Sequence, residues 1–266
     1  MDIIVVVFLA GLGLIIGSFL NVVIYRMRTG KSAMKGRSCC FSCGKNLEAR
    51  DLVPILSFCF LRGRCRRCKV KISWQYPVVE SLGLISVLVP FLVLEPTNIY
   101  SFVGYISTAI FFCTLTVMSV YDIRHKIIPD SISITLFVFA FLSVLFRDGT
   151  ISWPSSLFWY GALVIPASLF FLWAVTRGRG IGFGDVKLAP SLGLLLGLSS
   201  GITALLLSFW IGAALSLIIM AFNKFRNMHS ITMKSEVPFG PYLALGTFLA
   251  FAFQIDFSTL SSWLTF

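Results

Sequence analysis

Long runs of apolar residues separated by short polar stretches dominate the pattern along this chain. A helix of about 20 apolar residues crosses the hydrocarbon layer of a membrane, which is about 30 Å thick. Segments of this kind recur, and we expect eight helices near 3–24, 77–94, 100–121, 130–146, 155–176, 186–199, 201–222 and 238–256. The pattern predicts an all-α polytopic membrane protein with about eight transmembrane helices.

The composition supports this prediction, because 57% of the 266 residues are hydrophobic and only 12% are charged. Such a composition excludes an ordinary soluble domain. The first apolar segment opens with Met1 and Asp2, without a basic stretch before it or a small-residue cleavage site after it. We therefore expect a retained helix and not a removed signal peptide.

Lys and Arg alternate between the loops in a way that predicts the orientation of the chain. The first, third, fifth and seventh loops hold 21 of the 22 basic residues when Lys187, at the edge of the fifth loop, is counted with it, and Arg147 is the exception. Basic residues collect in cytoplasmic loops. We expect these four loops in the cytoplasm and both termini on the opposite side.

The first loop is the most basic, with 13 Lys and Arg between residues 26 and 71 against Glu48 and Asp51. Retention of the loop in the cytoplasm explains most of this charge. Membrane lipids with anionic headgroups are the expected partner. A nucleic acid is not expected, since few aromatic residues interleave with the basic ones and the loop is tethered to a membrane.

Two CxxC pairs lie in the same loop, in the stretches CCFSCGKN and RGRCRRCK. Each pair supplies two thiolates from one tight turn, and four thiolates complete a closed tetrahedral zinc site of the structural kind. The reducing cytosol argues against two disulfides. We predict a small cytoplasmic zinc-binding domain between the first two helices, with Cys40, Cys43, Cys65 and Cys68 as ligands and the adjacent Cys39 as an alternative to Cys40.

Glu80 and Asp122 are acidic residues expected at cytoplasmic helix boundaries. Glu80 follows Pro77 near the start of a predicted helix, where an acid complements the positive helix end, so a capping role and a functional role as a contact to substrate are both open. Asp122 ends a helix, where the dipole disfavours a carboxylate. It is either a functional residue or the partner of Arg124 or Lys126 in a surface salt bridge.

Asp185 follows three closely spaced glycines in GIGFGD and opens an apolar segment. Glycine permits the close approach of another chain, and we expect Gly182 and Gly184 to leave room for a substrate strand beside Asp185. The segment 186–199 spans only about 21 Å at about 1.5 Å per residue. Such a short segment borders a cavity or a thinned bilayer, so we expect water to reach the carboxylate.

Asp122 and Asp185 are 63 residues apart and are predicted on the same side of the membrane. Two carboxylates that share a site cannot both ionise easily, so one holds a proton while the other accepts one. Together they can activate a water molecule and protonate a peptide carbonyl. This is the chemistry of aspartyl proteolysis.

The chain resembles the type IV prepilin peptidases, which are bacterial inner-membrane aspartyl proteases with a GxGD motif. The resemblance covers nearly the whole chain. Besides the paired CxxC loop, its motifs are GSFLNVVIYR at 17–26, YPVVE at 76–80, YDIRHKIIPD at 121–130, GIGFGDVKLA at 180–189 and VPFGPYLALG at 237–246.

The resemblance implies that Asp122 and Asp185 are the catalytic pair and that the four cysteines bind zinc. It implies prepilin or pseudopilin substrates, cut on the cytoplasmic side after a leader glycine. It also implies methylation of the new N-terminus with S-adenosylmethionine. Lys187 matches a position of the family. Two roles are open for it: a contact to the aspartate pair or the substrate, or a charge that snorkels to the membrane interface.

On this basis we divide the chain into a transmembrane helix at 1–25, the cytoplasmic zinc domain at 26–75 and a transmembrane peptidase core at 76–266. We expect the protein in the bacterial inner membrane, with the active site facing the cytoplasm. Two other functions are considered. An ion- or proton-coupled transporter would use acids near broken helices, but it predicts internal repeats and acids deep within spans, which the sequence lacks. A noncatalytic zinc-bearing secretion scaffold is the second alternative.

Overall fold

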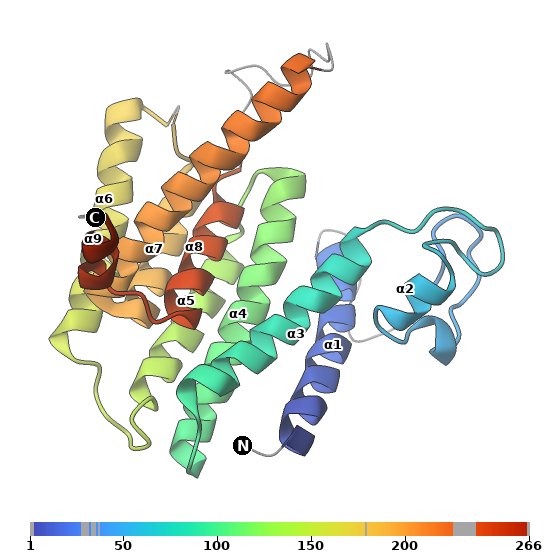
Figure 1. Cartoon of the computed structure of the whole chain (residues 1–266), viewed down its shortest axis with the longest axis horizontal. Helices are drawn as coiled ribbons and strands as arrows, with labels where there is room; N and C mark the ends of the chain where they lie inside the picture. The colour runs from blue at the N-terminus through green and yellow to red at the C-terminus, as the bar shows by residue number, and fades with distance from the viewer. Residues whose placement is uncertain are drawn as a thin grey trace. The chain divides into compact units, whose positions relative to one another are not determined.

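The computed structural model describes residues 3–27, 32, 36, 38–178, 180–225 and 238–264. Helices make up most of these residues, which confirms the all-α prediction (Figure 1). The chain forms two compact units, Met1–Glu95 with Phe112–Val117, and Pro96–Phe111 with Met118–Phe266. Residues 28–31 and 226–237 of the predicted basic loops lie outside the described residues.

The first unit is built on α1 (Ile3–Arg26) and α3 (Gln75–Leu94), which pack against each other. Glycines allow the two backbones to approach closely, as is usual between membrane helices. A Cβ atom built on Gly17 would lie 2.6 Å from the Cα of Glu80. The loop between these helices carries the short elements η1 (Ala49–Asp51) and α2 (Leu56–Phe60).

The second unit is organised around one long helix. It comprises α4 (Ile99–His125), apart from its stretch Phe112–Val117, together with α5 (Asp130–Leu145), α6 (Ser156–Thr176), α7 (Phe183–Phe225), α8 (Gly240–Ala252) and α9 (Phe257–Leu264). The long helix α7, orange in Figure 1, packs against α5, α6 and α8. Its N-terminus begins at the glycine turn that carries Asp185.

A break at Gly197 divides α7 into two helices. Gly197 has φ 76° and ψ −177°, a conformation outside the helical region and in the left-handed half of φ that favours glycine. Gly161 of α6 packs against this break, since a Cβ on Gly161 would lie 2.7 Å from the Gly197 carbonyl carbon. Each of the eight predicted apolar segments overlaps a helix, but the break at Gly197 falls inside the predicted segment 186–199 and not between it and the segment 201–222.

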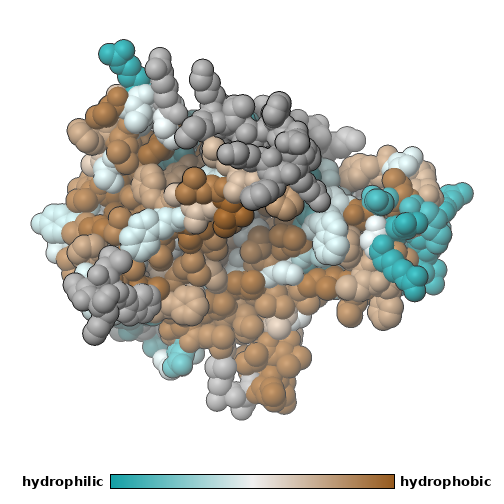
Figure 2. All heavy atoms as spheres, turned by 45° about the horizontal axis from the view of Figure 1, so that its top comes forward, coloured by the Kyte–Doolittle hydropathy of each residue, from teal (hydrophilic) through white to brown (hydrophobic). Residues whose placement is uncertain are grey.

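The helices have the length and exposure of membrane spans. Within the described residues, α1, α3, α4, α6 and α7 are long and apolar enough to cross a membrane, while α5 and α8 are shorter apolar helices. Hydrophobic side chains cover much of the face in Figure 2. Phe8 of α1, for example, is 68% exposed, which suits contact with lipid. The protein is a multi-pass membrane protein.

The contact between α1 and α3 predicts different effects for two glycines of α1. Gly17→Ala would push its methyl group into the backbone of α3, whereas Gly11 has no atom within 4 Å of a Cβ at its position. We expect Gly17→Ala to lower the free energy of unfolding by about 1–3 kcal/mol through overpacking. Gly11→Ala should not lower it, and thermal unfolding of the purified variants measures the difference. Equal loss in both would contradict this packing.

Candidate functional site

The two cysteine pairs form two matching turns in the loop between α1 and α3. In the first, the Cys40 N–H donates to Lys45 O at 2.9 Å and the Gly44 N–H donates to Cys40 O at 2.8 Å. In the second, the corresponding bonds are Cys65 N–H to Val70 O at 2.9 Å and Lys69 N–H to Cys65 O at 3.1 Å. Each turn thus presents two sulfur atoms from the same side of the backbone.

Four sulfur atoms meet between these turns. The Sγ atoms of Cys40, Cys43, Cys65 and Cys68 all lie within 4.8 Å of one another. A tetrahedral zinc ion with Zn–S bonds of about 2.3 Å requires sulfur atoms about 3.8 Å apart. The Sγ atoms of Cys40 and Cys68 are 3.8 Å apart. The geometry fits a closed metal site, and it includes Cys40 while leaving out Cys39.

Backbone hydrogen bonds favour the thiolate form of two of the four cysteines, Cys40 and Cys65. Hydrogen bonds from the backbone N–H groups of Cys68 and Arg67 lower the pKa of Cys65 to about 6. Backbone N–H groups of Cys43 and Ser42 lower the pKa of Cys40 in the same way. Because thiolates are the metal-binding form, the turns are prepared to hold a cation such as Zn²⁺.

Glu80 anchors the cysteine-bearing segment within the first unit. Its carboxylate accepts a hydrogen bond from the Ile55 N–H at 2.7 Å. Ile55 has φ 58° and precedes α2, so its N–H stands at the start of that helix. Glu80 is only 7% exposed. The capping role considered for this residue is therefore present, but the helix it serves is α2 and not its own helix α3.

Asp122 lies in the last turn of α4, in the second unit. Its backbone carbonyl accepts a hydrogen bond from Lys126 N–H at 2.7 Å, and Lys126 ends the helix in the left-handed conformation. The carboxylate is buried, with the residue 5% exposed. It accepts a hydrogen bond from the backbone N–H of Gly240 at the start of α8. Asp122 is thus no surface residue.

Asp185 is the third residue of α7 and is equally buried, at 5% exposure. Its carboxylate accepts a hydrogen bond from the Gly182 N–H, while its own N–H donates to Gly182 O at 3.2 Å. This is half of the capping arrangement that stabilises helix N-termini. The Asp122 carboxylate is close enough to interact electrostatically with it. The structure therefore brings the two sequence-predicted aspartates together.

Three further residues near Asp185, Gly182, Gly184 and Lys187, differ from one another in their surroundings. The position of a Cβ on Gly182 faces the Asp185 carboxylate at 3.5 Å, with the next nearest atom at 4.0 Å. A Cβ on Gly184 would lie close to the side chain of Ile128, with the Ile128 Cβ 3.2 Å away. Lys187 forms an exposed ion pair with Asp130 at 2.7 Å. Ile128 is the residue that limits space beside Gly184.

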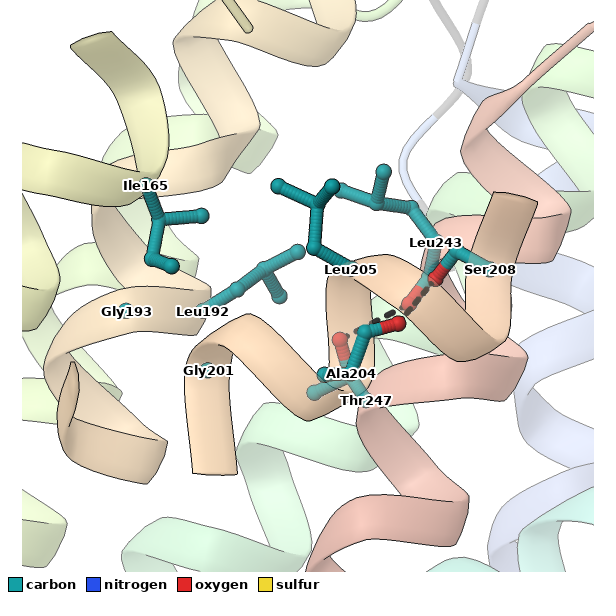
Figure 3. Close-up of a pocket in the computed structure, with 9 residues that line it drawn as sticks. All are labelled: Ile165, Leu192, Gly193, Gly201, Ala204, Leu205, Ser208, Leu243 and Thr247. Atoms are coloured by element: carbon teal, nitrogen blue, oxygen red, sulfur yellow. Dashed lines mark hydrogen bonds between the residues drawn. The ribbon is translucent and has the colours of Figure 1, made fainter. Parts of the chain in front are cut away.

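A small cavity lies within the second unit among α6, α7 and α8 (Figure 3). Leu192, Leu205 and Leu243 line it, and the hydroxyl groups of Ser208 and Thr247 donate to carbonyls of their own helices. The space open to the centre of a water molecule is about 10 Å³, which suits about one water molecule. It is far too small for S-adenosylmethionine.

Fold and site together define a class: a polytopic helical membrane protein with two adjacent buried aspartates at helix ends and a four-cysteine cluster that could hold a metal ion. Residues 12–94 match the family model of the bacterial peptidase A24 N-terminal domain, and residues 109–217 match that of the type IV leader peptidase family. The cysteine cluster falls in the first match and both aspartates fall in the second.

Curated relatives cover most of this chain and most of their own length. A prepilin leader peptidase/N-methyltransferase of Aeromonas hydrophila is 32% identical over 89% of this chain and 87% of its own. Relatives of the same name from Burkholderia pseudomallei and Xanthomonas campestris pv. campestris are each 31% identical, over 88% and 93% of this chain and 81% and 91% of theirs. The chain belongs to the type IV leader peptidase family. No solved structure matches it.

The cysteine geometry predicts the effect of two matched substitutions. Cys65→Ser removes one of the four ligands, whereas Cys39→Ser changes the exposed thiol beside the cluster. We expect bound zinc to fall from about one ion per chain to nearly none in Cys65→Ser, because a structural zinc site needs four ligands. Cys39→Ser should keep its zinc. Metal analysis of the purified proteins checks this, and loss of zinc in Cys39→Ser would contradict the ligand assignment.

Proposed function

We propose that this chain is a membrane aspartyl endopeptidase that removes the leader peptide of prepilins or pseudopilins and then N-methylates the new N-terminus. Its membership of the family and the name shared by its relatives support both activities. The observation that carries the proteolytic part is the buried pair of Asp122 and Asp185, whose carboxylates come from two helices and interact.

The pair can perform peptide hydrolysis without a metal ion or a covalent intermediate. One carboxylate removes a proton from water, which then attacks the carbonyl carbon of the peptide bond, while the other gives its proton to the carbonyl oxygen. Collapse of the resulting tetrahedral species breaks the C–N bond, and the amine leaves with a proton from the pair. Burial of both groups strengthens these electrostatic interactions.

The substrate strand is proposed to reach the pair along Gly182. A Cβ there would have only the Asp185 carboxylate and a backbone nitrogen within 4 Å. Gly184, Lys187 and Glu80 are the other proposed substrate contacts, and their side chains or faces also contact Ile128, Asp130 and Ile55. Of the two glycines, Gly182 has the more open surroundings.

The alternation of basic loops supports placing the pair on the cytoplasmic side of the bacterial inner membrane, with both termini on the other side. We divide the chain into a first transmembrane helix at 1–25, the zinc domain at 26–75 and the peptidase core at 76–266.

Zinc would hold the two cysteine turns together, and S-adenosylmethionine would supply the methyl group when bound. Lipid headgroups are the expected neighbours of the basic loop.

A transporter or a noncatalytic scaffold is not favoured. A transporter site near the bilayer midplane would place acids deep inside spans. Asp122 lies in the last turn of α4 and Asp185 in the first turn of α7, at helix ends. A scaffold would give no reason to bury two interacting carboxylates, which is costly without a function.

Substitution of either aspartate tests the peptidase assignment. With purified protein and a prepilin, Asp122→Asn and Asp185→Asn should each reduce leader cleavage by at least about 100-fold, since each removes a proton-transferring group. Asp148→Asn, in a loop where the residue is exposed, should cleave like the wild type. Thermal unfolding and zinc content should stay close to wild type. Full cleavage by either aspartate variant would disprove the catalytic pair.

The same variants separate the two activities. When a prepilin that has already lost its leader is supplied with S-adenosylmethionine, Asp122→Asn and Asp185→Asn should methylate it at the wild-type rate. The expectation follows from two separate sites, because the carboxylate pair has no part in methyl transfer. Incorporation of a labelled methyl group measures it. Loss of methylation in both variants would show that the two reactions share the aspartate site.

A further inference from the structure

The N-terminus of α8 is directed at Asp122. Gly240 is the first residue of this helix, it is buried, and its backbone N–H donates to the Asp122 carboxylate. The two residues are 118 positions apart in the sequence and lie in the same unit. The stretch around Gly240 is one of the family motifs quoted above, and no role could be predicted for it from the sequence.

The hydrogen bond uses one of the N–H groups that a helix leaves unpaired at its start. The next residue, Pro241, has no N–H group, and the N–H groups of Tyr242 and Leu243 both donate to Phe239 O. Among these first residues, Gly240 is therefore the one whose N–H is directed at a carboxylate.

The charge of the helix ends adds to this bond. Asp122 lies at the C-terminal end of α4, where the helix dipole is negative and disfavours a carboxylate. The N-terminal end of α8 is positive and stands opposite. The bond to Gly240 thus compensates for the unfavourable position of Asp122 on its own helix.

The position tolerates no side chain beside that carboxylate. A Cβ atom on Gly240 would lie 2.6 Å from Asp122 Oδ2, 3.3 Å from its Cγ and 3.2 Å from Met118 Sδ. Gly240 does not have the positive φ that would by itself call for glycine. Glycine is required here by the contact, because any larger residue must displace the carboxylate.

We propose that Gly240 is a positioning residue that holds the Asp122 carboxylate in place for reaction with its partner on α7. The proposal rests on the peptidase function and extends the site to a third element, the N-terminus of α8. Gly240 does not act on substrate itself. It fixes the orientation of a group that does.

The test compares Gly240→Ala with Gly212→Ala in the leader-cleavage reaction. Both place one methyl group at the packing surface of α8, but the three atoms nearest to the methyl on Gly212 all belong to the Tyr242 side chain, the first at 3.3 Å. We expect kcat of Gly240→Ala to fall about 10–100-fold with KM within about twofold of wild type, because a displacement of about 1 Å in a reacting group costs that much. Gly212→Ala should keep both constants.

A second measurement does not depend on activity. Introduced into the wild-type chain, Gly240→Ala should lower the midpoint of thermal unfolding. Introduced into the Asp122→Ala variant, where the clashing carboxylate is absent, the same substitution should lower the midpoint much less. This double variant also remains informative if Gly240→Ala alone fails to fold. Equal effects in both backgrounds would overturn the contact between Gly240 and Asp122.

The outcomes distinguish this inference from the proposed function. If the wild type does not cleave a prepilin, the proposed function fails, while thermal unfolding still tests the contact. If the wild type cleaves, Asp122→Asn does not, and Gly240→Ala keeps the wild-type kcat, the positioning role is wrong and the peptidase stands. A fall in kcat confined to Gly240→Ala supports both.

Discussion

The burial of two carboxylates beside apolar helices is the constraint on which the second unit depends. Each carboxylate has lost most of its contact with water, so each needs polar partners from the protein. Asp185 obtains one from the turn that begins its own helix, through Gly182. Asp122 stands at an unfavourable helix end and obtains one from another helix, through Gly240. The turns before α7 and α8 are thus parts of the site as well as of the fold.

Close backbone contacts keep these helix ends in register. Gly161 of α6 faces Gly197 of α7, and Gly184 before Asp185 faces Ile128 in the loop after α4. At both contacts a glycine allows a neighbouring segment to approach the helix that carries Asp185 closely. The first unit uses the same device between α1 and α3, where Gly17 meets the backbone of Glu80. Small residues position both the cysteine-bearing segment and the aspartate pair.

Much of this arrangement can be predicted from the sequence, because hydropathy, charge and cysteine spacing are local signals. Apolar runs locate the helices, and two CxxC pairs predict the cysteine cluster. The pairing of Asp122 with Asp185 follows from the side of the membrane assigned to each. The roles of Gly240 and Glu80 cannot be predicted in this way, since each depends on a partner from a distant segment. Likewise the sequence predicts space beside Gly184, but the packing of Ile128 there is a tertiary effect.

The central claim is that Asp122 and Asp185 act as one unit that shares a proton. Infrared spectroscopy of the full-length protein with isotope-labelled aspartate measures this directly, through the carbonyl stretch of a protonated carboxyl group. One such band is expected near neutral pH, and it should be lost in the Asn variant of either residue. A spectrum in which both carboxyl groups are ionised, or a band that survives both substitutions, would contradict it.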